Sequence, residues 1–228
     1  IGFIESSNSN EPFFLHVSYF DPHPPYMAPD EFLVNYDSKD MRLPDTVAPR
    51  PLSQRLQDFA DGFRMNEVSD DGFRETLRHY HASVEWGVDY QVGRLMNSLE
   101  EQGIEDDTIV IFTSDHGDFM ADYRLVRKGI FLYDALLHVP LFVRAPGHAP
   151  AGRNQTLAQL MDIFPTLVDM TGGEADERLM GRSLLPFMRG ESAPEDDALF
   201  TTGGYGQVEP VVNPSTNLDE EDETPLHT

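Results

Sequence analysis

The 228-residue sequence contains no cysteine and little lysine. Without cysteine it forms neither a disulfide nor a thiolate metal site, and any catalytic group made from cysteine must lie outside these residues. Lys39 and Lys128 are the two lysines, so nearly all of the 16 cationic residues are arginines. The longest apolar runs have the length of a buried strand, far below the roughly 20 residues that cross a bilayer. We therefore predict a soluble chain without a membrane anchor.

Acidic residues are abundant by contrast. The 40 Asp and Glu residues outweigh the 16 Lys and Arg residues and give a formal net charge of −24. An acid-rich, lysine-poor surface keeps a protein soluble where salt screens charge over short distances, which favours a halophilic source over an ordinary acidic protein. No basic stripe is present to neutralise phosphates, so we expect no nucleic-acid partner. The composition defines no oligomeric state.

Several segments carry helical patterns. Apolar residues recur every three or four positions over 73–101, which predicts a long amphipathic helix that Gly103 ends. A short helix is predicted near 52–60, within a long excursion rich in Pro, Asp and Gly. Another is predicted over 163–171, capped by Asp162.

Apolar runs predict buried strands at 12–20, 107–114 and 139–143. Strands that alternate with helices predict an α/β fold with a largely parallel sheet, whose ligands bind beyond the carboxyl ends of the strands. We assign residues 1–195 to this domain. Residues 196–228 are rich in acid, Gly and Pro, and we expect either a disordered stretch or the start of a truncated subdomain.

Three groups of side chains are suited to chemistry. Asp115 and His116 directly follow the strand at 107–114, and a carboxylate beside an imidazole suits a divalent cation such as Ca²⁺ or Mg²⁺. The alternative is a helix-capping Asp with an exposed His. Lys128 offers a compact ammonium to a sulfate or phosphate oxygen, or is a surface lysine. His23, held between prolines, is either a donor near an ester oxygen or a turn histidine without a role.

Taken together, these segments resemble the sulfatase family of the alkaline-phosphatase superfamily. The segment around His23 resembles a strand that ends in the family's His-x-Pro motif, and Asp115-His-Gly resembles the end of its metal-binding strand. The likeness implies an alkaline-phosphatase-like three-layer fold, of which this chain holds the C-terminal part and so an incomplete fold. Six stretches carry it in the family's order: 12–26, 80–95, 108–117, 128–143, 160–167 and 180–186.

The resemblance implies roles for four residues. Asp115 and His116 match a pair of metal ligands, most often for Ca²⁺, with Mg²⁺ or Mn²⁺ as alternatives. Lys128 matches the lysine that contacts the sulfate, and His23 matches the histidine beside the bridging ester oxygen. Both are implied to bind the substrate and to take part in catalysis.

The sequence also departs from the family pattern. The formylglycine nucleophile of the family arises in a Cys/Ser-x-Pro-x-Arg motif, which is absent here together with the first acidic pair of metal ligands. We expect both to lie in a missing N-terminal part, so the 228 residues alone are predicted to be inactive. Ala121-Asp-Tyr-Arg124 replaces the family's Gly-Asp/Glu-His-Gly, and we predict that Tyr123 and Arg124 contact the substrate instead.

The resemblance implies that the full-length parent is a metal-dependent, arylsulfatase-like sulfuric ester hydrolase acting on a small-molecule or glycan sulfate ester. A phosphonate or phosphate ester hydrolase of the same superfamily shares these motifs and is the first alternative. A non-catalytic, sulfatase-like binding protein is the second. The charge of −24 disfavours the binding of polyanions, and the joint presence of all four implied site residues disfavours a degenerate enzyme.

Overall fold

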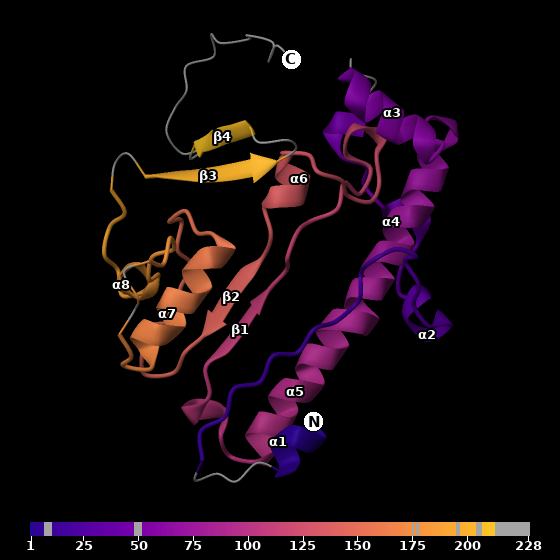
Figure 1. Ribbon diagram of the computed structural model, residues 1–228. Helices are drawn as coiled ribbons and strands as arrows, with labels where there is room; N and C mark the ends of the chain where they lie inside the picture. Colours follow the sequence, from indigo (N-terminus) through magenta and orange to yellow (C-terminus); the bar gives the residue numbers. More distant parts are fainter. Residues whose placement is uncertain are drawn as a thin grey trace. The chain divides into compact units, whose positions relative to one another are not determined.

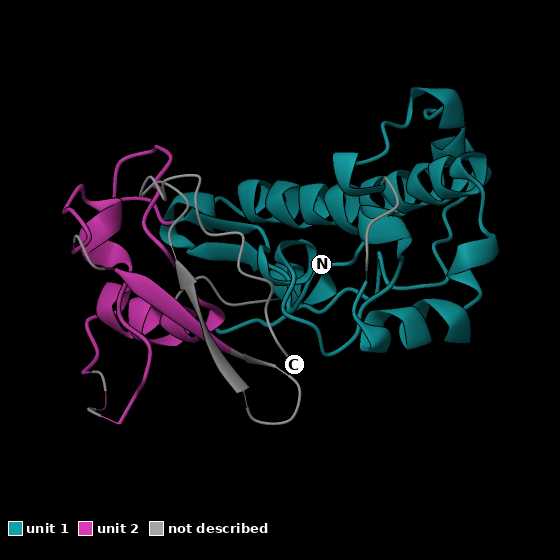
Figure 2. Cartoon of the chain, turned by 90° about the horizontal axis from the view of Figure 1, so that it is seen from above, with its two compact units in different colours: residues 1–144 teal, residues 145–228 magenta. Residues whose placement is uncertain are grey.

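The computed structural model describes residues 1–6, 11–47, 52–174, 176, 178–194, 197–203 and 207–212, with side chains as far as residue 201. The chain divides into two compact units, residues 1–144 and 145–228, coloured separately in Figure 2. All of the predicted site residues belong to the first unit. The boundary predicted at residue 195 falls on residues outside the described ones.

A long helical segment dominates the first unit (Figure 1). It consists of α4 (Asp70–Val84), a π-helical turn (Glu85–Asp89) and α5 (Tyr90–Glu101). Gly103, with φ 66°, follows its end in the left-handed conformation that favours glycine. The buried residues Phe73, Leu77 and Leu99 confirm the predicted apolar face, whereas the π turn has no signal in the three- and four-residue spacing. None of the helices in the described residues has the length and apolar character that a membrane crossing requires.

Two of the predicted strands are confirmed as β1 (Val110–Thr113) and β2 (Leu141–Arg144). They pair antiparallel, with Val110 opposite Arg144, whereas the expected sheet was largely parallel. A parallel pair needs a crossover that returns the chain to the starting end of the sheet, usually through a long helix. Residues 114–140 instead form a loop at the carboxyl end of β1, and its one α-helix is the single turn α6 (Asp134–Leu137).

The third predicted strand, residues 12–20, is wrong for the described structure. These residues follow α1 (Gly2–Ser6) as unpaired chain. Phe14 and Phe20 are 81% and 70% exposed, and His16, which the pattern places in a buried strand, is exposed too. A run of apolar residues favours burial, but a strand also needs a hydrogen-bonded neighbour, and none of the described strands pairs with this segment.

A small apolar core lies beneath the loop that follows β1. Its buried residues come from α3 (Gln54–Gly62), from Met65, and from the loop and α6: Leu56, Ala60, Met65, Phe119, Leu125 and Leu136. The Ser53 side chain caps α3 by accepting a hydrogen bond from the Leu56 amide at 3.4 Å, so the predicted short helix is confirmed. The excursion also holds α2 (Asp30–Leu33) and 3₁₀ turns at Ser38–Asp40, Asp45–Val47 and Met65–Glu67.

The second unit contains α7 (Ile163–Met170), which confirms the predicted helix, α8 (Leu185–Met188), and strands β3 (Ala198–Gly203) and β4 (Gln207–Val212). Asp162 precedes α7, but it does not cap the helix as predicted. Its carboxylate instead accepts hydrogen bonds from the Gln159 and Arg182 amides at 2.8 and 2.9 Å. β3 and β4 pair antiparallel, with Ala198 opposite Val212. The acidic run 219–223 lies outside the described residues.

Candidate active site

Strand β1 places Asp115 and His116 just beyond its carboxyl end, where both side chains are exposed. Asp115 Oδ1 accepts a hydrogen bond from the His116 amide at 3.0 Å. The His116 Nδ1 lies 2.9 Å from the Gly117 carbonyl oxygen. Because a carbonyl oxygen can only accept, Nδ1 carries the proton and donates. In the neutral ring the Nε2 lone pair is then available, which is the tautomer that a metal ligand needs.

The two side chains fit a shared cation as part of its ligand set. Asp115 Oδ2 and His116 Nε2 are 3.7 Å apart, a separation that two ligands reach when each lies roughly 2.0–2.6 Å from one divalent ion. Among the described residues, however, no three His, Cys, Asp or Glu side chains converge on one point. Asp115 and His116 by themselves therefore do not make up a whole coordination sphere among the described residues.

Position 117 requires a glycine because the backbone of α6 comes close to it, and not because of its backbone angles. An added Cβ would lie 1.9 Å from the Ala135 carbonyl oxygen, at the start of α6. The Gly117 amide donates a hydrogen bond to the Leu136 carbonyl oxygen at 2.8 Å. Asp115 and His116 are thus held next to α6 through the glycine that follows them.

His23 lies at the tip of a turn whose Asp21-Pro22 and Pro24-Pro25 peptide bonds are cis. Its side chain is exposed, while Pro24 beside it is buried. The Nδ1 donates to the Pro24 carbonyl oxygen at 2.7 Å, which leaves Nε2 as the ring atom that faces a ligand. The ring also lies 4.6 Å from the ring of Phe20, centroid to centroid. Local contacts therefore set both the tautomer and the tilt of the imidazole.

Two side chains that the sequence analysis missed hold the ends of this turn. Ser83 of α4 donates a hydrogen bond to Asp21 Oδ1 at 2.8 Å. At the other end, the Tyr26 hydroxyl donates to Asp118 Oδ2 at 2.7 Å. Burial, and then the hydrogen bond to Asp118, raise the pKa of Tyr26 far above its usual range, so the phenol stays a donor. The one signal for Asp21, Tyr26 and Asp118 in the sequence was that they lie close to His23 or directly after Asp115-His-Gly.

The loop after Asp118 holds an unusual backbone. Five of its non-glycine residues have positive φ, a conformation that costs energy for residues with a side chain and that clusters at functional sites. They are Met120, Ala121, Tyr123, Arg124 and Arg127, with φ between 40° and 75°. Packing of the loop on the α3 core holds this backbone in place.

Arg124 and Tyr123, predicted to contact the substrate, have partners within the protein. The Arg124 guanidinium donates to Asp70 Oδ1 and to the Val68 carbonyl oxygen, both at 2.7 Å, and lies 5.0 Å from the centre of the Phe73 ring. The ring of Tyr123 packs edge-on against Tyr133 at 5.0 Å. These contacts favour a structural role for both residues.

Lys128 follows this loop and is half-buried. Its ammonium makes no hydrogen bond or ion pair with any residue that the structure describes, so its charge stays available to an anion. One loop thus joins Asp115 and His116 to Lys128. The Tyr26–Asp118 hydrogen bond brings the His23 turn to the same loop.

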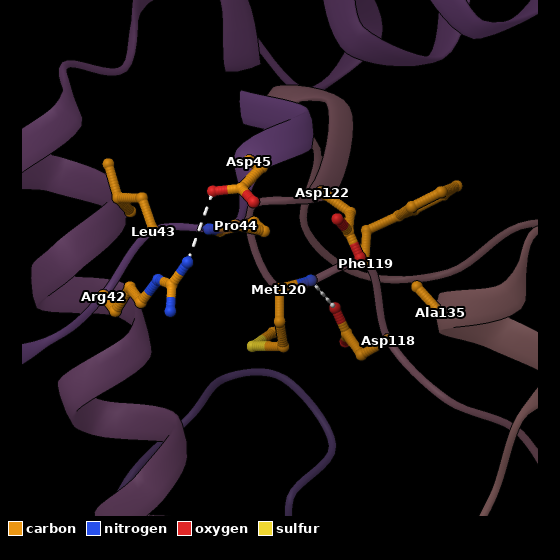
Figure 3. Close-up of a pocket in the computed structure, with 9 residues that line it drawn as sticks. All are labelled: Arg42, Leu43, Pro44, Asp45, Asp118, Phe119, Met120, Asp122 and Ala135. Carbon is orange, nitrogen blue, oxygen red and sulfur yellow. Dashed lines mark hydrogen bonds and ion pairs between the residues drawn. The ribbon is translucent and has the colours of Figure 1, made fainter. Parts of the chain in front are cut away.

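A pocket of about 510 Å³ borders this loop (Figure 3). Asp118 lies at its edge, with Oδ1 accepting a hydrogen bond from the Met120 amide at 3.3 Å, and Arg42 pairs with Asp45 across it at 3.5 Å. Apolar side chains complete the wall. The lining residues are Arg42, Leu43, Pro44, Asp45, Asp118, Phe119, Met120, Asp122 and Ala135.

Comparison with known proteins establishes the family. A family model described as Sulfatase matches residues 1–173, and the chain belongs to the sulfatase family. It is 32% identical over 195 residues to the choline-sulfatase of Rhizobium meliloti, and 31% identical over 202 residues to the multifunctional alkaline phosphatase superfamily protein PehA of Trinickia caryophylli. Each match covers 82% of this chain but 37% and 39% of the relative, so the chain spans well under half of their length.

Solved structures confirm the fold. The phosphonate monoester hydrolase of Agrobacterium radiobacter superposes with a TM-score of 0.72 at 30% identity, covering 87% of this chain and 42% of that one. The YidJ protein of Bacteroides fragilis, described as a putative sulfatase, superposes with a TM-score of 0.68 at 26% identity, covering 87% and 40%. The α/β, alkaline-phosphatase-like class expected from the sequence is therefore confirmed.

Proposed function

We propose that these residues form one side of the active site of a metal-dependent sulfuric ester hydrolase. Asp115 and His116 would hold a divalent cation, with Ca²⁺ as the first choice because the carboxylate is a hard ligand. Such an ion stabilises negative charge on the sulfuryl oxygens. The remaining ligands, and a formylglycine nucleophile, would come from outside the 228 residues.

Lys128 and His23 have complementary roles in this proposal. The Lys128 ammonium, which has no partner among the described residues, binds a sulfuryl oxygen and stabilises charge there. His23 carries its Nδ1 proton toward Pro24, so Nε2 is placed to exchange a proton with the bridging ester oxygen. Protonated at Nε2, the ring helps the alkoxide to leave.

One observation carries the proposal. The Tyr26–Asp118 hydrogen bond joins two segments 92 residues apart in the sequence. One of them bears His23, and the other bears Asp115, His116 and, farther along, Lys128. A coincidental match of short motifs would not require that these segments meet in space. Membership of the sulfatase family makes ester hydrolysis the chemistry that this assembly serves best.

A phosphonate or phosphate ester hydrolase is the second candidate. It is favoured by the 30% identity to the phosphonate monoester hydrolase structure and by the likeness to PehA. The same residues would serve either reaction, because sulfate and phosphonate groups both present anionic oxygens to a cation and an ammonium.

The full-length protein, loaded with Ca²⁺, tests the choice. We expect turnover of an aryl sulfate with a larger kcat/KM than that of an aryl phosphonate monoester or an aryl phosphate diester. A clear preference for the phosphonate would replace the first candidate with the second. Binding of a sulfate ester without turnover of any of the three would instead indicate a non-catalytic protein.

Two variants test the assigned roles. Lys128→Ala is expected to lower kcat/KM about 10²–10³-fold through lost charge stabilisation, and His23→Ala about 10²–10⁴-fold for an ester with a poor leaving group. Lys39→Ala is the matched control for the lysine, and His138→Ala, at an 80% exposed side chain, for the histidine. Wild-type activity in Lys128→Ala would contradict the assignment.

A further inference from the structure

His23 depends on its surroundings for its place in the site. Its ring is exposed, and its contacts are with Pro24 and Phe20, its own neighbours in the chain. These contacts orient the imidazole within the turn but do not fix the turn against the rest of the unit. The position of Nε2 relative to the site must therefore be set where the turn begins and ends.

The start of the turn is seated on the long helix. The Ser83 hydroxyl, which is fully buried, donates to Asp21 Oδ1 at 2.8 Å. Asp21 also lies directly over Gly87 in the π-helical turn, where an added Cβ would be 2.3 Å from the Asp21 Cβ and 2.4 Å from its Oδ2. The Asp21 carboxylate is thus held by the hydrogen bond from Ser83, and it fits there because Gly87 has no side chain.

The end of the turn contacts the same helix and the loop that contains Asp118. The ring of Tyr26 packs edge-on against Tyr80 at 5.6 Å, and Tyr80 lies three residues before Ser83, so both face one side of α4. The Tyr26 hydroxyl donates to Asp118, whose other oxygen accepts from the Met120 amide. Asp118 therefore connects the turn to the loop between the metal-ligand pair and Lys128.

We propose that Ser83, Gly87, Tyr26 and Asp118 are positioning residues that fix His23 Nε2 against the reacting ester. The first two set where the turn starts, and the last two set its distance from the loop that bears Asp115, His116 and Lys128. The proposal assigns each of the four an effect that acts through the placing of His23. Figure 1 shows the indigo segment that contains the turn running beside the long helix, as these contacts require.

This inference rests on the proposed function, because it assigns a consequence to the placing of the proposed leaving-group histidine. A purely structural role would lower activity equally for all esters. Mispositioning of a proton donor instead costs most when the leaving group needs the proton most. The informative quantity is therefore the ratio of kcat/KM for an aryl ester with a low-pKa phenol to that for one with a high-pKa phenol.

The experiment compares Gly87→Ala with Gly93→Ala in the full-length, Ca²⁺-loaded protein. Both glycines lie in the same long helical segment, but nothing lies within 4 Å of a Cβ at Gly93. We expect Gly87→Ala to raise the kcat/KM ratio roughly 10-fold or more, as an error near 1 Å in placing a catalytic group does. Gly93→Ala should leave the ratio at the wild-type value. Tyr26→Phe should raise the ratio as Gly87→Ala does, and Tyr90→Phe should not.

Two further measurements distinguish a folding defect, or a failure of the proposed function, from a failure of the anchoring proposal. Should Gly87→Ala fail to fold, Ser83→Ala removes the same anchor without adding an atom, and a ratio unchanged in Ser83→Ala would overturn the proposal. Should the wild-type protein hydrolyse no ester, the proposed function fails alone. The anchoring is then read from the imidazole NMR signals of His23, which must shift in Gly87→Ala and Tyr26→Phe and stay in place in Gly93→Ala. Unshifted signals would refute the anchoring itself.

Discussion

At the scale of single residues, Gly117 has no room for a side chain at its place beside Asp115 and His116. A Cβ there would meet the backbone of Ala135 and lie 3.2 Å from the Leu136 Cα, atoms that cannot rotate away as a side chain can. We expect Gly117→Ala to lower the free energy of unfolding by roughly 1–3 kcal/mol, the range typical of overpacking. Denaturant titration of the full-length protein measures it.

Gly62→Ala is the control for this substitution. Gly62 is the last residue of α3, and no atom lies within 4 Å of an added Cβ. Alanine there should leave stability unchanged or raise it, since alanine is the better helix former. Equal stability of the Gly117 and Gly62 variants would show that the loop moves freely relative to α6.

Tyr26 should make stability depend on alkaline pH. Its pKa is raised in the folded protein, first by burial and then by the Asp118 carboxylate. A group whose folded pKa lies above its unfolded value stabilises the fold fully below the unfolded pKa, near 10 for tyrosine, and loses that contribution as the pH rises further. The stability difference between wild type and Tyr26→Phe should thus be constant from about pH 7 to 9 and shrink above about pH 10.

Thermal unfolding of both proteins across this pH range tests the sign. A difference that grows above pH 10 would mean that ionised Tyr26 is favoured in the fold, which the nearby carboxylate makes unfavourable. Activity below pH 9 should show no step from Tyr26, because the phenol remains protonated there.

At the scale of elements, α7 depends on a buried carboxylate. Asp162 is 2% exposed and accepts hydrogen bonds from the Gln159 and Arg182 amides. Asp162→Ala would leave two amides without an acceptor, which we expect to cost roughly 2–4 kcal/mol and to speed their hydrogen exchange. Asp169→Ala, at an exposed carboxylate of the same helix that accepts one hydrogen bond from the Ser183 hydroxyl at 2.6 Å, should cost less, about 1 kcal/mol.

The same scale shows what the sequence can predict. The helix at 70–101 follows from apolar spacing and from Gly103, and both signals act within a few positions of the chain. Strand pairing depends on distant partners. The antiparallel order of β1 and β2, and the absence of pairing at 12–20 among the described residues, were therefore not predictable.

The candidate site likewise has a local part that the sequence predicts and long-range contacts that it does not. Asp115 and His116 were placed correctly at the end of β1, since the strand and the residues after it are contiguous. The contacts of Asp118 with Tyr26 and of Asp21 with Ser83 join segments 92 and 62 residues apart. A pattern read along the chain has no access to such contacts, and the engagement of Arg124 by Asp70 was missed for the same reason.

At the scale of the whole molecule, the charge of −24 opposes folding, because the compact state brings like charges together. The end of α5 shows the conflict locally. Glu100 and Glu101 are both exposed in the last turn of the helix, which holds no basic residue. Acidic side chains are unfavourable there, since the carbonyl end of a helix already carries partial negative charge.

We therefore expect salt to stabilise the protein, whatever its source. The Debye length falls from about 10 Å at 0.1 M to about 3 Å at 1 M, so KCl should raise the midpoint of thermal unfolding most steeply below about 0.5 M. Glu100→Gln combined with Glu101→Gln should raise the midpoint at low salt and weaken its dependence on KCl.

The control combines Glu5→Gln with Glu31→Gln, near the starts of α1 and α2. It removes the same charge but also a favourable interaction with the helix ends. If repulsion across the whole surface dominates, both pairs flatten the salt dependence equally. If the helix ends dominate, only the first pair raises the midpoint at low salt, and a midpoint that falls as KCl is added would contradict both explanations.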